Sequence, residues 1–384
     1  MAQQNPHPFI AATTTDKIFG CIIGSALGDA VGLYTEFLSK IQSKRAYPDR
    51  TFSLVEPVTR IFPDTHRLQF PPCSWTDDTD QALLILLAYL HLKTNHQSTI
   101  DLAQEFATRL KIWVARGLPA LSRPAFDIGM LVNAVASNPR YLDDPVRCAT
   151  ERWIKSDRKA APNGSLMRTH PIGVIGVNLT EEQTWRLSVL VGVVRQLLRG
   201  QIDTEKSLDA AIERAWEWVR RQQEVMNPGN DGGLSERQIA RHLERGEFER
   251  HVYAQSLDEL KLDEEGKIGY VYKCLGSAIF LLRVAIRRAT RATLAMELAL
   301  KAQLFEKSMV QLVMEGGDAD TNGAAAGALL GAYLGYANLP SHWKFGLADN
   351  EWLMGKAERL AVAVGVARGE LKKERDEDAH GGKK

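Results

Sequence analysis

The chain has 384 residues, of which 45% are hydrophobic and 25% charged, with 48 Lys and Arg against 47 Asp and Glu. This composition is typical of a globular protein and excludes a disordered, collagen-like or disulfide-scaffold chain. The net charge of +1 argues against a nucleic-acid partner, because such binding rests mainly on a surplus of basic side chains.

Apolar residues recur at helical spacing through most of the sequence, without a convincing series of alternating strands. The predicted fold class is therefore all-α. In chain order, the expected helices cover residues 17–33, 77–92, 100–116, 128–136, 145–156, 182–198, 207–223, 236–244, 269–288, 293–314, 321–336 and 352–368.

We expect one domain over residues 16–368. Residues 1–15 are polar and are expected to be flexible, and residues 369–384 are mostly charged or glycine and are expected to be disordered. From 201 to 267 the pattern becomes charged and amphipathic before apolar helices resume at Gly269. This segment is interpreted as a helical insertion at the surface of the domain.

The cysteines and apolar stretches bear on the compartment. The four cysteines are single residues without the CxxC spacing of zinc sites, and are expected to be reduced: Cys21, Cys73, Cys148 and Cys274. Neither a secretory signal nor an apolar stretch of the roughly 18 to 20 residues that a membrane span needs is evident. We expect a soluble monomer of the cytoplasm or nucleus with no membrane partner.

Glycine recurs at every fourth position near both ends of the domain. One series is Gly20, Gly24, Gly28 and Gly32, and the other is Gly323, Gly327, Gly331 and Gly335. Glycine costs about 1 kcal/mol relative to alanine inside a helix, and close approach of two backbones would offset that cost. A tight helix contact explains each series by itself. If the two series met, they would also bring both ends of the domain into one core.

Two acidic clusters precede apolar helices. Asp77, Asp78 and Asp80 follow Thr76, whereas a pair of glycines precedes the sequence DADT at 318–321. Helix capping explains one aspartate. Three within four residues exceed that need, and their mutual repulsion favours a bound cation. Facing one another, the clusters could hold two hard cations about 3.5 to 4 Å apart. The alternative is capping plus solvated acids, and an EF-hand is excluded because alanines replace its later ligands.

Residues 162–171 form a third segment of interest. Either Ser165 caps a short helix in a turn, or the backbone N–H groups and Arg168 meet a phosphate.

Four motifs together resemble the ADP-ribosylglycohydrolase family, which includes dinitrogenase reductase activating glycohydrolase, the ADP-ribosylhydrolases and the J crystallins. They are GSALGDAVG at 24–32 with Glu36, WTDDT at 75–79, NGSLMR at 163–168 and GGDADTN at 316–322. The motifs follow the order of the family over residues 16–366. The resemblance implies an all-α orthogonal helical bundle with a dinuclear magnesium or manganese site at its centre.

The resemblance also implies roles for individual residues. The implied metal ligands are Thr76, Asp77, Asp78, Asp318, Asp320 and Thr321. Glu36 matches a glutamate beside the metals, and Glu36 or Asp78 would handle protons. The loop near the ribose and diphosphate corresponds to Asn163, Gly164, Ser165, Met167 and Arg168. Gly129 matches a phosphate-side glycine loop, although a plain helix start explains it nearly as well.

The implied function is magnesium-dependent hydrolysis at the anomeric carbon of the distal ribose in ADP-ribosylated proteins or small ADP-ribosyl compounds. One alternative is a phosphatase acting on ADP-ribose 1″-phosphate, because the same metals could polarise a phosphoryl group. Another is a non-catalytic relative like the J crystallins. The complete set of ligand positions favours an enzyme, whereas the Thr-His pair of many family members is missing from residues 185–192.

Overall fold

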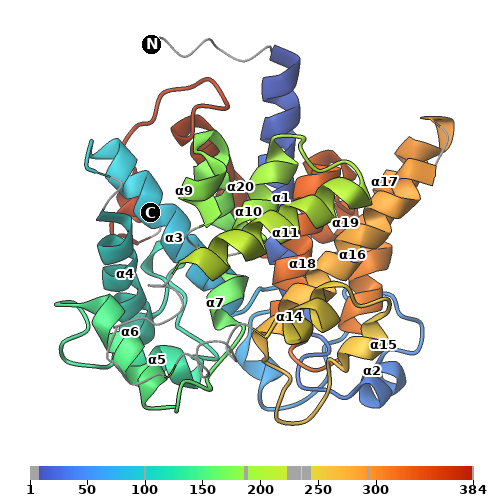
Figure 1. Cartoon of the computed structure of the whole chain (residues 1–384), viewed down its shortest axis with the longest axis horizontal. Coiled ribbons are helices and arrows are strands. Elements are labelled where there is room, and N and C mark those ends of the chain that lie inside the picture. The colour runs from blue at the N-terminus through green and yellow to red at the C-terminus, as the bar shows by residue number, and fades with distance from the viewer. Residues whose placement is uncertain are drawn as a thin grey trace.

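The structure, a computed structural model, describes residues 8–98, 101–185, 189–222, 235, 244–291 and 294–382. Within these ranges it contains helices and two isolated β-bridges but no strand, which confirms the all-α class (Figure 1). The helices of the first half are α1 Pro8–Gly32, α2 Lys40–Ala46, η1 Arg67–Gln69, α3 Asp77–Thr94, α4 Leu102–Arg116, η3 Pro119–Leu121, α5 Met130–Ala136, α6 Pro145–Ile154, α7 Gly164–Met167, α8 His170–Ile175, η4 Gly176–Asn178, α9 Glu181–Trp185 and α10 Val189–Leu198. Those of the second half are α11 Glu205–Arg221, α14 Arg245–Val252, α15 Leu257–Leu260, α16 Val271–Arg291, α17 Leu294–Val313, α18 Ala319–Leu334, η5 Tyr336–Asn338, α19 Ser341–Lys344, α20 Asn350–Ala363 and η6 Arg375–Glu377.

The centre of the bundle is a close contact between α1 and α18, formed by the two glycine series. Gly24 lies against Gly327, and Gly28 lies against Gly323, so that a Cβ atom at any of these positions would overlap the carbonyl oxygen of its partner. The predicted backbone approach is therefore confirmed for these pairs. Gly335 has a different role, because its φ of +83° ends α18 in a conformation that favours glycine.

The other long helices surround this pair. Helices α16 and α17 pack against α18, α10 contacts both α1 and α18, and α3 packs against α4 and α20 (Figure 1). The predicted helix at 182–198 is α9 and α10, with residues 186–188 outside the described chain. The helix predicted at 236–244 also lies outside it, except for residue 244. No helix in the described ranges is long and apolar enough to cross a membrane.

The 201–267 segment packs against the bundle through α11 and α14. Both helices contact α16. The ring of Trp216 on α11 stacks on Phe248 of α14 with centroids 4.5 Å apart, and both side chains are buried. The described part of this segment therefore shares the hydrophobic core of the domain.

Both ends of the domain contact or continue its helices. Residues 8–15 belong to α1, while residues 1–7 lie outside the described chain, and the flexible start stays a prediction. Near the other end, Glu377 is 1% exposed, and its carboxylate accepts hydrogen bonds from Lys356 and Arg359 of α20. Its carbonyl accepts from Arg109 of α4 at 2.6 Å.

In the structure, charged residues of the 369–384 segment, for which disorder stays a prediction, have side-chain partners on α20. Composition indicates disorder when charges have no fixed partners. Here Lys356 is 2% exposed and meets three carboxylates, those of Glu374, Asp376 and Glu377. These ion pairs attach the segment to α20, and the charged composition alone did not reveal them.

Candidate metal and substrate site

The two acidic clusters meet where α3 and α18 begin. The Thr76 hydroxyl, at the N-cap of α3, donates to Asp320 Oδ2 at 3.1 Å. The Thr321 hydroxyl of α18 donates to Asp78 Oδ2, also at 3.1 Å. The glycine contact between α1 and α18 thus has the consequence inferred from the sequence, because each helix start lies within hydrogen-bond reach of the other.

Asp29 of α1 fixes the start of α3. Its buried carboxylate accepts from the backbone N–H groups of Thr76 at 2.8 Å and Thr79 at 2.9 Å. These bonds satisfy free N–H groups of the first helical turn. Burial raises the pKa of Asp29 to about 6. No separate role for Asp29 was predicted from the sequence, in which its one signal is an acid within an apolar, glycine-rich helix.

Asp80, the third acid of the first cluster, points elsewhere. Its carboxylate accepts from the indole N–H of Trp75 at 2.8 Å and from that of Trp113 at 3.1 Å. This buried acid joins α3 to α4, so it has a packing role and is not part of the facing pair of clusters.

Positive backbone angles shape the loop that leads into α18. Gly316 and Gly317 have φ of +72° and +70°, which favours glycine at both positions. The N–H of Gly317 donates to the carbonyl of Leu38 at 2.8 Å, and its carbonyl accepts from Phe37 at 2.6 Å. The turn after α1, which carries Glu36, is therefore tied to the loop that carries Asp318.

Several carboxyl groups are buried close together at this site. Burial is the largest cause, and neighbouring carboxylates the next, that raises the pKa of each of Asp77, Asp78 and Asp320 well above the usual aspartate value. Among the described atoms, Asp78 Oδ1 and Asp320 Oδ1 are buried without a hydrogen-bond partner. Such oxygens are costly unless a cation meets them. Carboxylate and hydroxyl oxygens are the ligands that Mg²⁺ and Mn²⁺ prefer, so these residues fit a hard divalent cation.

Glu36 and Asp318 lie on the same side of the two clusters. Glu36, Asp318 and Asp320 each offer a carboxylate oxygen within 4.8 Å of the others. Asp318 also accepts from Asn163 Nδ2 at 2.8 Å, which links the second cluster to the segment before α7. Burial, and then the nearby charge of Asp127, raises the pKa of Glu36 well above the usual value.

The 163–168 loop runs beside the first cluster. The negative charges of Asp77 and Asp78 act on Arg168, although burial, the larger effect, lowers the pKa of its guanidinium. The Arg168 Nε donates to the carbonyl of Gly164. The loop is held in turn by Asn163, whose N–H donates to the carbonyl of Gly269 at 2.9 Å.

The remaining members of the predicted substrate loop divide by exposure. Met167 is buried, whereas Ser165 is exposed and its hydroxyl donates to the carbonyl of Pro162 at 3.3 Å. Ser165 is not the helix cap considered from the sequence, because α7 starts after Asn163 without a side-chain cap. Gly129 is the exposed N-cap of α5.

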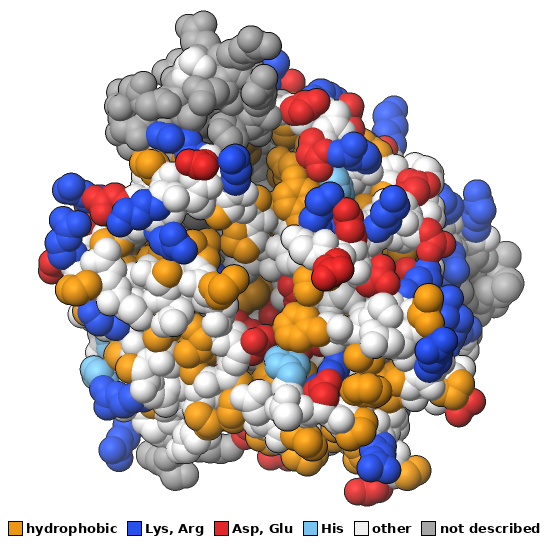
Figure 2. Space-filling model, turned by 90° about the horizontal axis from the view of Figure 1, so that it is seen from below, with side chains coloured by type: hydrophobic (Ala, Val, Ile, Leu, Met, Phe, Trp, Pro, Cys, Tyr) orange, Lys and Arg blue, Asp and Glu red, His pale blue; other side chains and the backbone are white. Residues whose placement is uncertain are grey.

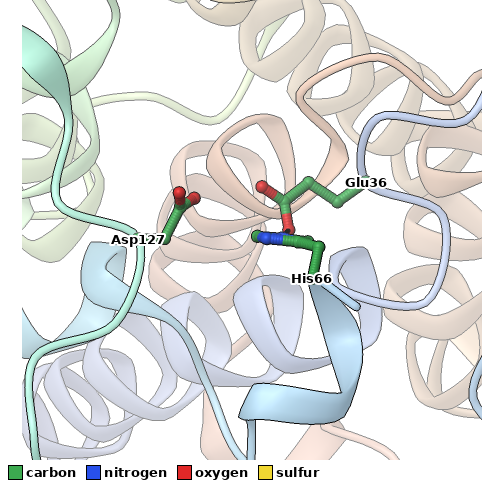
Figure 3. Close-up of side chains that lie close together, drawn as sticks. All are labelled: Glu36, His66 and Asp127. Carbon is green, nitrogen blue, oxygen red and sulfur yellow. Dashed lines mark hydrogen bonds and ion pairs between the residues drawn. The ribbon is translucent and has the colours of Figure 1, made fainter. Parts of the chain in front are cut away.

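His66 and Asp127 complete the mouth of the site. In Figure 3, the ring of His66 lies next to the Glu36 carboxylate, and the Asp127 carboxylate lies across from both. His66 Nε2 lies 2.7 Å from Glu36 Oε2, and one ligand atom each of Glu36, His66 and Asp127 lies within 4.8 Å of the others. The face drawn in Figure 2 is hollowed near its centre, with acidic side chains inside the hollow and a histidine at its edge. A single histidine in a polar loop gave no reason to select it.

The fold and the site together define an α-helical protein with a buried acidic centre whose residues could hold a metal ion, and comparison with known proteins gives its family. A profile of the ADP-ribosylglycohydrolase family matches residues 11–370, so the chain belongs to the ADP-ribosylglycohydrolase family. This membership supports hydrolysis of ADP-ribosyl groups as the general activity.

Individual relatives agree with this assignment. The chain is 26% identical to an uncharacterized protein of Archaeoglobus fulgidus over 348 residues, which cover 90% of this chain and 96% of that protein. It is 23% identical to the ADP-ribosylarginine hydrolase Tri1 of Serratia proteamaculans and 24% identical to that of Pseudomonas putida. These alignments cover 90% of this chain and 79% and 78% of the two relatives. A solved structure titled ADP-ribosylglycohydrolase-related protein complex shares the fold, with a TM-score of 0.56, 23% identity and coverage of 92% of this chain and 99% of that chain.

Proposed function

We propose that the chain is a magnesium-dependent hydrolase that cleaves the bond at the anomeric carbon of the distal ribose in ADP-ribosyl compounds, with arginine-linked ADP-ribose as its substrate. The observation that carries the proposal is the meeting of the two acidic helix starts. They join through the Thr76–Asp320 and Thr321–Asp78 hydrogen bonds and leave buried carboxylate oxygens without partners.

Two Mg²⁺ or Mn²⁺ ions would be held by the six metal ligands that the family resemblance implies, which are Thr76, Asp77, Asp78, Asp318, Asp320 and Thr321. Bound there, such ions supply a positive charge that polarises the ribose oxygens and lowers the pKa of water. In return, the cations neutralise carboxylates that burial otherwise makes costly.

Glu36 handles protons at the reaction centre. Water forms a new bond to the anomeric carbon while the bond to the leaving group breaks through an oxocarbenium-like transition state. One proton of the water passes to a carboxylate, and the leaving group takes up a proton as it departs. Burial raises the pKa of Glu36 well above its usual value, so its carboxyl group holds a proton to a higher pH than an exposed glutamate does. Asp78, hydrogen-bonded to Thr321, is the second carboxylate able to accept a proton.

The 163–168 loop and the start of α5 serve the diphosphate and the ribose. Arg168 supplies positive charge and the planar donors that match phosphate oxygens. Asn163, held against Asp318, brings an amide to the edge of the acidic clusters, where ribose hydroxyls would lie. Gly129, exposed at the start of α5, leaves the backbone open to close approach.

The choice of an arginine linkage rests on the charge at the mouth of the site. Glu36 and Asp127 both lie there, and a guanidinium leaving group carries the opposite charge. The same two carboxylates would repel the terminal phosphate of ADP-ribose 1″-phosphate, which disfavours the phosphatase alternative. Both named relatives are ADP-ribosylarginine hydrolases, in agreement with this choice.

The test is hydrolysis of a panel of substrates with Mg²⁺ and after chelation. The panel contains arginine- and serine-linked ADP-ribosyl peptides, O-acetyl-ADP-ribose and ADP-ribose 1″-phosphate, and an Asp318→Ala variant is the control. We expect Mg²⁺-dependent release of ADP-ribose from the arginine-linked peptide and its loss in the variant. If the protein hydrolyses only another substrate of the panel, the linkage in that substrate replaces the arginine linkage in the proposal. No turnover by folded protein that binds Mg²⁺ would contradict the hydrolase and favour a non-catalytic relative.

A further inference from the structure

We propose that His66 is a positioning residue for this reaction, because its Nε2 hydrogen bond holds the Glu36 carboxylate at the mouth of the site. The inference rests on the proposed function, in which Glu36 exchanges protons. The two side chains come from segments 30 residues apart and meet at 2.7 Å (Figure 3).

Glu36 needs such a partner because most of the charged side chains near it repel it. The negative charges of Asp127, Asp318 and Asp29 act against ionised Glu36, and only the positive charge of Arg67 among the causes of its pKa shift favours it. Asp127 can share a hydrogen bond with Glu36 when one of the two carboxyl groups is protonated. His66 offers a bond in either state of Glu36, because a neutral imidazole donates from Nε2–H to a carboxylate or accepts at Nε2 from a carboxylic acid. Burial lowers the pKa of His66, which favours the neutral ring.

The imidazole is itself held in place by neighbouring aromatic rings. Its centroid lies 4.9 Å from that of Phe37 and 5.5 Å from that of Phe70. Phe37 has a φ of +57°, an uncommon angle for a side chain of this size, and its N–H is tied to the carbonyl of Gly317 at 2.6 Å. The strained backbone of Phe37, next to Glu36, is therefore held by two contacts, which are the hydrogen bond to Gly317 and the ring contact with His66.

Arg67, the next residue after His66, fixes the backbone of the same turn. Its buried guanidinium donates to the carbonyls of Leu33 at 2.9 Å and of Glu36. Its backbone N–H donates to Asp64 Oδ1 at 2.8 Å. Arg67 therefore joins η1 to the end of α1, while His66 reaches the Glu36 side chain. Arg67 therefore holds the backbone of Glu36, and His66 holds its carboxylate.

Two substitutions of His66 separate the effect of its hydrogen bond from the effect of its ring packing. His66→Phe keeps an aromatic ring between Phe37 and Phe70 but removes the nitrogen. His66→Gln loses the ring but keeps a donor that reaches Glu36. We expect kcat to fall roughly 10- to 100-fold in His66→Phe with KM within about twofold, and to stay within about fivefold of wild type in His66→Gln. His342→Phe removes a partly exposed histidine far along the chain, on α19, and serves as the control.

Equal losses of kcat in both His66 variants would overturn the inference, as would an unchanged kcat in His66→Phe. The Mg²⁺-induced rise in Tm must be the same in all variants, which separates positioning from a loss of structure. A readout without turnover uses protein labelled with ¹⁵N-histidine. We expect the Nε2 resonance of His66 to shift in Glu36→Ala, because Nε2 loses its partner whether it donates to Glu36 or accepts from it. If wild type has no turnover on the panel, the proposed function fails, whereas an unchanged Nε2 resonance in Glu36→Ala contradicts the hydrogen bond.

Discussion

The Thr321 hydroxyl donates a hydrogen bond to Asp78 Oδ2 at 3.1 Å, although the two residues are 243 positions apart in the sequence. The bond exists because α18 lies against α1, whose Asp29 in turn holds the first turn of α3. The positions of the site residues therefore depend on the contact between α1 and α18, in which Gly32 also lies against the backbone of Asp320.

That dependence predicts the effect of one methyl group at Gly28. In Gly28→Ala, the new Cβ would overlap the carbonyl of Gly323 and push α1 away from α18. We expect a loss of about 1 to 3 kcal/mol in the free energy of unfolding, even though alanine is the better helix former. Mg²⁺ binding should weaken at the same time, since residues 319–321 move with α18. Chemical denaturation and isothermal titration calorimetry measure the two effects.

Gly355→Ala is the matched control, because Gly355 lies within α20 and no described atom is within 4 Å of its added Cβ. It should leave stability unchanged or raise it by up to about 1 kcal/mol. Equal effects of the two substitutions would show that the glycine contact does not set the spacing of the helices.

The buried carboxylates predict opposite effects of Asp320→Asn on stability and on metal binding. The amide keeps an oxygen that accepts from Thr76 but removes a buried charge. Without metal, we expect Tm to rise, by an amount corresponding to about 1 kcal/mol or more. The increase in Tm on adding Mg²⁺ should disappear, together with turnover. Asp49→Asn, at an exposed position, should change stability by less than about 0.5 kcal/mol. A less stable metal-free Asp320→Asn would contradict the assumed repulsion.

The raised pKa values predict that Mg²⁺ stabilises the protein more at higher pH. Burial raises the pKa of Asp77, Asp78 and Asp320 in the folded, metal-free state above the ordinary value of about 3.8. Folded protein then binds more protons than unfolded protein, so metal-free stability falls as pH rises through this window. Mg²⁺ requires ionised carboxylates and removes the penalty. As the pH rises above the ordinary carboxyl pKa, the Mg²⁺-induced increase in Tm should therefore grow, and a constant increase would refute the linkage.

The C-terminal ion pairs predict a large effect of a conservative change at Glu377. Glu377→Gln removes a buried charge that faces both Lys356 and Arg359. We expect the free energy of unfolding to fall by about 2 to 4 kcal/mol, because the two cations lose their closest buried partner. Glu370→Gln alters an exposed pair with Lys372 and should cost less than about 0.5 kcal/mol. Similar costs in thermal denaturation would mean that residues 369–382 add little to stability.

The sequence was sufficient to predict the long helices, and it indicated that the glycine series and the acidic clusters could meet, but it did not predict α2 or α14. Each has a local, periodic signal, such as the four-residue spacing of Gly20 to Gly32 or the position of Asp77 and Asp78 at a helix start. Each pattern indicates which face or end of a single helix makes a contact, and two helices with the same glycine spacing are expected to pack against each other.

His66, Arg67 and the ion pairs of Glu377 could not be predicted in this way. Their roles depend on loops whose paths no periodicity describes, and on partners far along the chain. Arg67 is nearly fully buried because the carbonyls of Leu33 and Glu36 receive its guanidinium. In sequence terms it is an ordinary arginine in a polar loop. Likewise, the acidic residues near 377 indicate a solvated tail until Lys356 is known to face them.

The pairing of α1 with α18 also sets the order of events when the chain is made. During synthesis, residues 76–78 leave the ribosome long before residues 318–321 exist, so the nascent chain cannot complete the acidic centre. Closing so long a loop is slow compared with forming the separate helices. The repulsion between the two acidic helix starts arises at the moment when α18 docks. If the proposed cations bind there, they would relieve this repulsion, and folding of the whole domain and metal binding would be joined in one late step.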